Sequence, residues 1–264
     1  MSEELGAAGL RFDREGPIAW CIIDRPEARN ALTPAMYFGI KRAVRIVNRD
    51  PDLAALVITG TGDVFAPGGD LGGRSEPGDA PIPDIGQDIL PFLAIRDSRA
   101  PVVAAVNGIC QAGGLLIAML ADIAVASDRA TFRVPELLRG IPDATYAAVL
   151  PAHVGLAVAR DLLLSARRFD AAEAQRLGVV SRMVPHDQLR EAAVQAVREI
   201  LQTPPNARMH VKRMLNERYG LIDYQTMFWA IEESSEPREG MQAFMEKRPP
   251  SWVPKGLSPE DSPG

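Results

Sequence analysis

The chain has 264 residues, of which 47% are hydrophobic and 24% charged, and it contains 22 glycines and 22 prolines. This length allows one large domain or two small ones, and it excludes a mini-protein with a marginal core. A formal net charge of -5 argues against broad electrostatic binding to nucleic acid or to acidic membranes. Proline exceeds its average share of about 5%, and because the remaining composition is that of a globular protein, we attribute the excess to local turns and loops.

Three sequence features bear on the cell compartment. Two cysteines, Cys21 and Cys110, are too few for a disulfide framework, and neither has a metal-binding spacing around it. The N-terminus is acidic and lacks the apolar segment of a signal peptide. Residues 101–121 carry no charge, but Asn107, Gln111 and three glycines interrupt them, which favours a buried strand, a turn and a buried helix over a membrane span. We therefore expect a cytoplasmic protein that does not bind membranes.

In chain order, short apolar runs rich in β-branched residues alternate with loops and helices. The runs are typical of buried strands and lie at residues 18–24, 55–59, 102–106, 123–126 and 179–184. Between the first two, Thr33 is the expected N-cap and Pro34 the first residue of a helix that stops at Asp50-Pro51. This alternation predicts an α/β fold with parallel strand pairing.

The pattern becomes helical from Asp187 onward. Further helices are expected around residues 207–218, 223–234 and 237–247, and the tail after Arg248 is dense in proline. Their many methionines and aromatic residues favour core or subunit packing over a cofactor site. We therefore divide the chain into a core at 1–200 and a C-terminal helical region for oligomerisation, with its tail, at 201–264.

A glycine pair follows the second predicted strand and could suggest a dinucleotide-binding loop. Gly60 and Gly62 begin such a motif, but Phe65 stands where the third glycine would be needed. No helix follows that could direct its N-terminus at a pyrophosphate. The sequence therefore argues against nicotinamide chemistry.

Several short blocks occur along the chain in a recognisable order. They are Asp24-Arg25-Pro26 with Asn30-Ala31-Leu32, residues 60–71 (GTGDVFAPGGDL), residues 101–114 (PVVAAVNGICQAGG), Ala121-Asp122, Pro135-Glu136 with Gly140, residues 174–180 (AQRLGVV) and residues 239–248 (EGMQAFMEKR). In their joint order and spacing the chain resembles the crotonase superfamily, the enoyl-CoA hydratase/isomerase family, over nearly its whole length. The resemblance implies an α/β crotonase (ClpP-like) fold, with a spiral core of ββα units and a C-terminal helical region.

Two glycines stand where the resemblance places an oxyanion hole. The reactions of this family pass through a thioester enolate, whose oxygen needs two preplaced backbone N–H donors. By position these donors would be the amides of Gly69 and Gly113, the second at the start of a helix whose dipole also attracts negative charge. Either glycine taken alone would be better explained by a tight turn, but the occurrence of both in matching blocks favours the oxyanion hole.

The acid/base residues depart from the pattern of the hydratases that this chain resembles. Those enzymes carry two glutamates, but here the first position is Leu116 and only the second is kept, as Glu136. Water addition divides its work between two carboxylates, whereas one base can move a double bond, so a lone Glu136 favours isomerase-like chemistry. Alternatively, Pro135-Glu136 simply begins a short helix that ends before Gly140.

Asp143 and Tyr146 follow in a segment that differs from the glycine-rich run of the family hydratases. Asp143 lies close to where dienoyl-CoA isomerases of the family have an extra aspartate, but it could equally be a turn or N-cap residue. Tyr146 could line the pocket or belong to the core. His153, His186 and His210 match no catalytic position of the family.

For coenzyme A, the resemblance places the backbone around Ala28, Ala66 and Gly68 near the adenine and pantetheine. Of the nearby cations Arg25, Arg29, Lys247 and Arg248, we select Arg29 and Lys247 for the phosphates.

Together these features predict an acyl-CoA enzyme without a metal or a separate cofactor, since coenzyme A is part of the substrate. The resemblance implies a homotrimer or a dimer of trimers. Decarboxylation, thioester hydrolysis and a non-catalytic acyl-CoA-binding role remain alternatives.

Overall fold

The computed structural model describes residues 5–70, 72, 78–79, 90–218, 231–232 and 234–253. A six-stranded sheet has the order β1-β2-β3-β5-β7-β10, and a four-stranded sheet has the order β4-β6-β8-β9. The strands of the first sheet are β1 (Leu10–Glu15), β2 (Ile18–Ile23), β3 (Ala55–Gly60), β5 (Val102–Val106), β7 (Ile123–Ser127) and β10 (Arg182–Val184). Those of the second are β4 (Val64–Ala66), β6 (Ile109–Gln111), β8 (Thr131–Arg133) and β9 (Phe169–Asp170). The strand pairs β1–β2 and β8–β9 are antiparallel, and all other pairs are parallel.

Each of the strands β3, β5 and β7 of the large sheet is followed by a short strand of the small sheet, namely β4, β6 and β8. This alternation between two sheets confirms the α/β crotonase fold.

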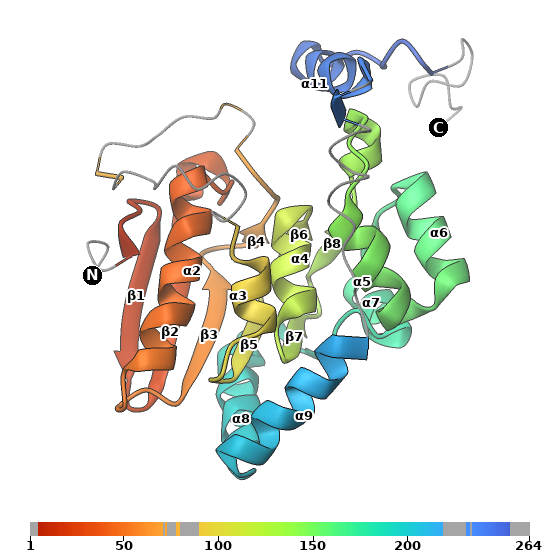
Figure 1. The fold of residues 1–264 in the computed structure, drawn as a ribbon. Helices are drawn as coiled ribbons and strands as arrows, with labels where there is room; N and C mark the ends of the chain where they lie inside the picture. Colours follow the sequence, from red (N-terminus) through yellow and green to blue (C-terminus); the bar gives the residue numbers. More distant parts are fainter. Residues whose placement is uncertain are drawn as a thin grey trace.

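Helices cover both faces of the large sheet (Figure 1). The helices are α2 (Pro34–Arg49), α3 (Phe92–Arg96), α4 (Gly113–Leu120), α5 (Ala144–Val154), α6 (Leu156–Ser165), α7 (Ala171–Leu177), α8 (Leu189–Leu201), α9 (Pro205–Arg218) and α11 (Glu236–Glu246). Short 3-10 helices are η1 (Pro26–Ala28), η3 (Glu136–Arg139) and η4 (His186–Gln188).

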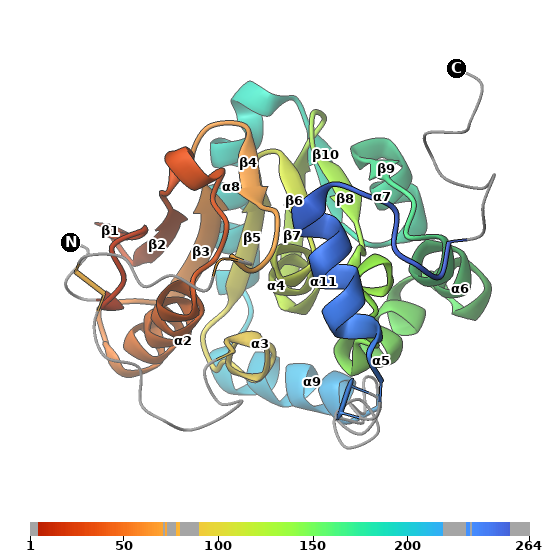
Figure 2. The same ribbon diagram turned by 90° about the horizontal axis from the view of Figure 1, so that it is seen from above.

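Alternate residues of β2 enter two different hydrophobic clusters. Ala19 and Cys21 pack with residues of α2 and α4, whereas Ile18 and Trp20 pack with α8 on the opposite face. Both faces of this strand are therefore buried, which explains its continuous apolar run. Figure 2 shows the same arrangement, with α2, α3 and α4 on one side of the strands and α8 on the other.

The first long helix begins and ends as its sequence predicts. Thr33 is the N-cap of α2 and accepts a hydrogen bond from the Met36 amide at 3.2 Å, with Pro34 as the first helical residue. The uncharged segment 101–121 forms β5, β6 and α4, as predicted. No helix in the described ranges is long and apolar enough to span a bilayer.

Some predicted elements differ from the structure. The strand expected at 179–184 forms only at Arg182–Val184. Gly178 ends α7 in the left-handed conformation, and the amide of Val179 donates back to Ala174, so the first part of the run belongs to a helix cap. The helix expected at 223–234 lies almost wholly outside the described residues.

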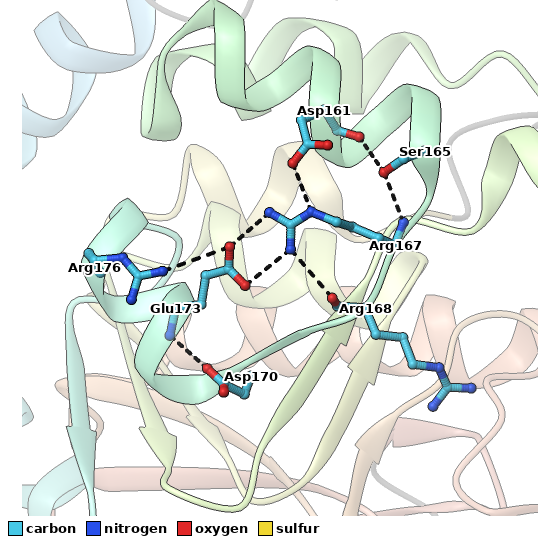
Figure 3. Close-up of polar contacts among 7 residues, drawn as sticks. All are labelled: Asp161, Ser165, Arg167, Arg168, Asp170, Glu173 and Arg176. Atoms are coloured by element: carbon cyan, nitrogen blue, oxygen red, sulfur yellow. Dashed lines mark hydrogen bonds and ion pairs between the residues drawn. The ribbon is translucent and has the colours of Figure 1, made fainter. Parts of the chain in front are cut away.

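An ion-pair cluster joins α6 to α7 and β9 (Figure 3). The guanidinium of Arg167 donates to both carboxylate oxygens of Glu173, at 2.8 and 3.1 Å, and to Asp161 at 2.7 Å. Asp170 caps α7 by accepting from the Glu173 amide. These carboxylates raise the pKa of Arg167 through hydrogen bonds. These side chains bond to one another within the cluster. We therefore assign the cluster a structural role, in which it holds the end of the small sheet in place.

Candidate active site

The proposed site residues follow the ends of three adjacent parallel strands. In the small sheet β4 pairs with β6, and β6 pairs with β8. Gly69 follows β4, Gly113 follows β6 and Glu136 follows β8. Because parallel neighbours end at the same edge of a sheet, three segments distant in sequence are brought to one edge.

The turn after β4 leaves one amide free. Leu32 donates to the Gly68 carbonyl at 2.9 Å, and the Asp70 amide donates to the Leu32 carbonyl at 2.8 Å. The N–H of Gly69, between these two bonded residues, takes no part in the pattern and has no acceptor among the described residues. Gly69 is also exposed. Gly68 has a φ of 114°, and a Cβ there would lie 2.5 Å from the Ala112 Cβ. The first oxyanion-type donor thus lies beside the loop that carries the second.

The turn after β6 presents Gly113 in a similar way. Ala112 has a φ of 50°, a conformation that is strained for a residue with a side chain. Its carbonyl accepts hydrogen bonds from the Tyr146 hydroxyl at 2.6 Å and from the Leu116 amide at 3.1 Å. Gly113 is the first residue of α4, so its N–H has no helical acceptor. We refer to the N–H groups of Gly69 and Gly113 as the glycine amide pair.

Glu136 begins η3, and Gly140 ends it in the left-handed conformation, as the local helix interpretation predicts. That role does not use the carboxyl group. Its Oε2 atom is buried and has no hydrogen-bond partner within the described chain. Burial, followed by the negative charge of Asp143, raises the pKa of Glu136 to about 8. Such a value near neutrality suits a group that gives and takes protons.

The structure shows the N-cap role of Asp143, one of the two roles that the sequence left open. It is the N-cap of α5, and its carboxylate accepts from the Tyr146 amide at 2.9 Å. Burial raises its pKa despite these hydrogen bonds. The negative charge of Asp143 also raises the pKa of Glu136, so the two carboxyl groups are near enough to interact electrostatically. A second carboxyl is therefore present, although not at position 116.

Three other proposed residues are buried. Leu116 on α4 is 1% exposed and belongs to the main hydrophobic cluster. Tyr146 is 0% exposed, and its hydroxyl donates a hydrogen bond to the Ala112 carbonyl. It therefore stabilises the turn that carries Gly113 from within the core. The side chain of Ala66 is also buried, and the Ala66 carbonyl packs so close to Gly114 that a Cβ there would overlap it.

The four candidate cations for coenzyme A divide into two pairs. Arg25 is buried and binds Asp70 at 2.7 Å, and Arg248 binds Glu239 at 2.7 Å. In contrast, Arg29 and Lys247 are exposed and have no ion-pair partner within the described ranges. Ala28 ends η1 directly before Arg29, and Lys247 follows α11. The two cations selected from the sequence are thus free to bind an anion.

Arg25 serves the site in a way that the sequence analysis missed. Its guanidinium joins the Ala31 carbonyl to the carboxylate of Asp70, the residue directly after Gly69. The Asn30 side chain accepts from the Arg25 amide and donates to the Val64 carbonyl at the start of β4. The Asp-Arg-Pro and Asn-Ala-Leu blocks therefore hold the first glycine turn in place.

Tyr37 is a second residue that the sequence analysis missed. It lies on α2, and a Cβ on Gly113 would overlap its hydroxyl oxygen. The sequence shows a tyrosine among the apolar residues of α2, which could have suggested a buried hydroxyl group. Where that hydroxyl lies, however, depends on how α2 packs against the ends of the strands.

Among the described residues, no group of three or more His, Cys, Asp and Glu side chains is placed to hold a metal ion. Two of the three histidines bond elsewhere, His153 to the Gly178 carbonyl and His186 to Ser127.

Comparison with known proteins decides the family. The sequence profile described as "Enoyl-CoA hydratase/isomerase" matches residues 13–255. The chain belongs to the enoyl-CoA hydratase/isomerase family. Carnitinyl-CoA dehydratase of Salmonella arizonae is 35% identical over 256 residues, covering 92% of this chain and 97% of that protein.

Two solved structures extend this result to the fold. Carnitinyl-CoA hydratase from Mycobacterium avium has a TM-score of 0.77 and 30% identity, over 92% of this chain and 98% of that one. An enoyl-CoA hydratase from Mycobacterium avium subsp. paratuberculosis has a TM-score of 0.78 and 26% identity, over 94% of this chain and 100% of that one. The chain is thus a crotonase-fold enzyme of this family.

Proposed function

We propose that this enzyme forms an enolate from an acyl-CoA thioester, with Glu136 as the base and the glycine amide pair as the oxyanion hole. The observation that carries the proposal is the buried Oε2 atom of Glu136, which has no hydrogen-bond partner among the described residues and lies at the same sheet edge as the glycine amide pair. In the reaction, the ionised Glu136 takes a proton from the α-carbon and the C–H electron pair moves into the thioester. Each amide donor lowers the barrier by about 3 kcal/mol.

The leading reaction is isomerase-like, with weak hydration. Glu136 would take the α-proton of a 3-enoyl thioester and return it to the γ-carbon, which shifts the double bond by one position. The leucine at position 116 supports this choice, because it is buried in the core and can neither hold water nor carry a proton.

Hydration or dehydration is the second candidate, and the pairing of Glu136 with Asp143 favours it. Two facing carboxyl groups could hold a water molecule and deliver a proton between them. The relatives named for dehydration and hydration of carnitinyl-CoA support an acyl-CoA substrate and the addition or removal of water. Decarboxylation and thioester hydrolysis use the same enolate-stabilising site or oxyanion hole and would be detected as released CO2 or free coenzyme A.

Hydrogen exchange tests the enolate directly. The enzyme is incubated in heavy water with a saturated acyl-CoA, and loss of the α-proton signal is followed by NMR. We expect exchange in the wild type and its loss in Glu136→Gln, while Glu217→Gln on the exposed face of α9 exchanges normally. Equal exchange in Glu136→Gln would refute the role of the base, and no exchange in the wild type would favour the non-catalytic alternative. Parallel assays with 2-enoyl-CoA and 3-enoyl-CoA then separate hydration from isomerisation.

We also propose that Arg29 and Lys247 bind the coenzyme A phosphates, beside backbone around Ala28, Ala66 and Gly68. Their exposed, unpaired side chains in the described structure support this role. Each neutral variant, Arg29→Gln or Lys247→Gln, should raise KM and leave kcat nearly unchanged. A fall in kcat alone would contradict this assignment.

A homotrimer or a dimer of trimers, working in the cytoplasm, completes the proposal. Large apolar side chains are exposed on α9 and α11, among them Met214, Leu215, Phe244 and Met245. Such a set favours burial between subunits. Light scattering should give three or six chains per particle, and Leu215→Glu should lower that number. A monomeric wild type would refute the assembly.

A further inference from the structure

The Tyr37 side chain reaches from α2 to both glycines of the amide pair. A Cβ built on Gly113 would overlap its hydroxyl oxygen, and one on Gly69 would lie 3.8 Å from that oxygen. The hydroxyl therefore lies beside both backbone donors, on a helix that comes from a different part of the chain. Its closeness also explains why position 113 must be glycine, since any side chain would displace the phenol.

The Tyr37 ring is held in place, while its hydroxyl has no hydrogen-bond partner among the described residues. Tyr37 is 8% exposed, and its ring meets Phe92 edge-on, with 6.1 Å between ring centres. In the described part of the chain, the hydroxyl makes no hydrogen bond to protein. A tyrosine ring that is largely buried normally presents its hydroxyl to a hydrogen-bond partner, which here could be a bound ligand. Tyr146 differs in this respect, because its hydroxyl already donates a hydrogen bond to the Ala112 carbonyl.

The charges around Tyr37 keep it a hydrogen-bond donor. Burial, then the negative charges of Glu136 and Asp143, raise its pKa above the usual value. The phenol therefore stays protonated over the working pH range.

We propose that the Tyr37 hydroxyl is a third hydrogen-bond donor to the thioester oxygen, beside the amides of Gly69 and Gly113. The inference rests on the proposed acyl-CoA function and adds a residue to its oxyanion hole. No proton is transferred: the phenol donates to the carbonyl oxygen of the bound thioester and more strongly to the enolate oxygen.

A binding experiment tests the donor without relying on turnover. Calorimetry compares a saturated acyl-CoA with its thioether analogue, which lacks the carbonyl oxygen, in the wild type and in Tyr37→Phe. The variant should bind the thioester about 5- to 20-fold more weakly and the thioether within about twofold of the wild type, as expected for one lost donor. Phe92→Leu is the matched control, because it loosens the ring and keeps the hydroxyl, and it should change both affinities by the same factor.

The exchange assay adds a second measurement. Tyr37→Phe should lower the α-proton exchange rate by about 10- to 100-fold. A Tyr37→Phe protein with unchanged thioester affinity and exchange would overturn the inference, and so would equal losses for thioester and thioether. If the wild type shows no exchange but the thioester-specific loss occurs, the donor role stands and the enolate reaction fails. Urea unfolding of each variant shows that it is folded.

Discussion

The buried carboxyl of Glu136 should make activity and stability respond to pH in opposite directions. Burial and the nearby Asp143 raise its pKa from 4.5 to about 8. Between these two values the native protein holds a proton that the unfolded chain releases. The free energy of unfolding therefore falls as the pH rises through this range, and it is level above and below it.

Replacing Glu136 by Gln removes the ionisation and keeps the size of the side chain. A tenfold change in an ionisation constant corresponds to about 1.4 kcal/mol. We therefore expect Glu136→Gln to be more stable than the wild type by about 2–4 kcal/mol at about pH 9 and by much less below about pH 5. The measurement is urea unfolding followed by fluorescence at both pH values. Glu173→Gln is the control with the opposite sign, because its hydrogen bonds to Arg167 lower the pKa of Glu173.

The same carboxyl must be ionised to remove a proton. Exchange of the α-proton should rise about tenfold per pH unit up to about pH 8 and level off above it. In Asp143→Asn the midpoint should move to lower pH, because a neighbouring negative charge is lost while asparagine still caps α5. A flat rate profile, or a Glu136→Gln protein with the stability of the wild type at both pH values, would refute the reasoning.

Three further variants test the rest of the site. Gly113→Ala should reduce exchange at least about 100-fold and lower the free energy of unfolding, because its Cβ overlaps the Tyr37 hydroxyl. Tyr37→Phe in the same chain should restore part of the lost stability in urea unfolding; no restoration of stability would contradict the overlap. Arg25→Met should lower the free energy of unfolding by about 3 kcal/mol, since it removes the buried guanidinium that pairs with the carboxylate of Asp70. A change below about 0.5 kcal/mol in urea unfolding would show that this ion pair contributes little to stability. Leu116→Glu should speed hydration of 2-enoyl-CoA and destabilise the protein at neutral pH, because it buries a carboxyl group; an unchanged hydration rate would count against our account of this position.

The sequence predicted the large sheet better than the small one. Strands such as β5 are buried on both faces, so their β-branched runs stand out. The strands β4, β6 and β8 have three residues each, which is too short for a periodic pattern. Yet these strands bring Gly69, Gly113 and Glu136 together. Their positions came from the family resemblance, and pattern alone could not have found them.

The sequence analysis did not predict the strand β1 or a role for Tyr37, and the two omissions have different causes. The strand β1 alternates buried Leu10 and Phe12 with exposed charged residues, so its signal was present and was overlooked. Tyr37 could not be assigned from sequence. Helical periodicity places it near Met36 and Ile40 on the buried face of α2, but its contact with Gly113 depends on the packing of that helix against the ends of β4 and β6.

The distribution of charge explains how a site with so few polar groups can support an enolate. Burial and the negative charge of Asp143 raise the pKa of Glu136 to about 8, so at neutral pH the resting Glu136 carboxyl is mostly protonated. When the ionised Glu136 takes the α-proton, its negative charge moves to the thioester oxygen, and the net charge of the pocket does not change. A carboxylate at position 116 would add a second negative charge beside that oxygen and oppose the transfer. In the proposed reaction, leucine at position 116 leaves the enolate facing hydrogen-bond donors and the newly protonated Glu136, an arrangement that would favour proton movement along the acyl chain over the capture of water.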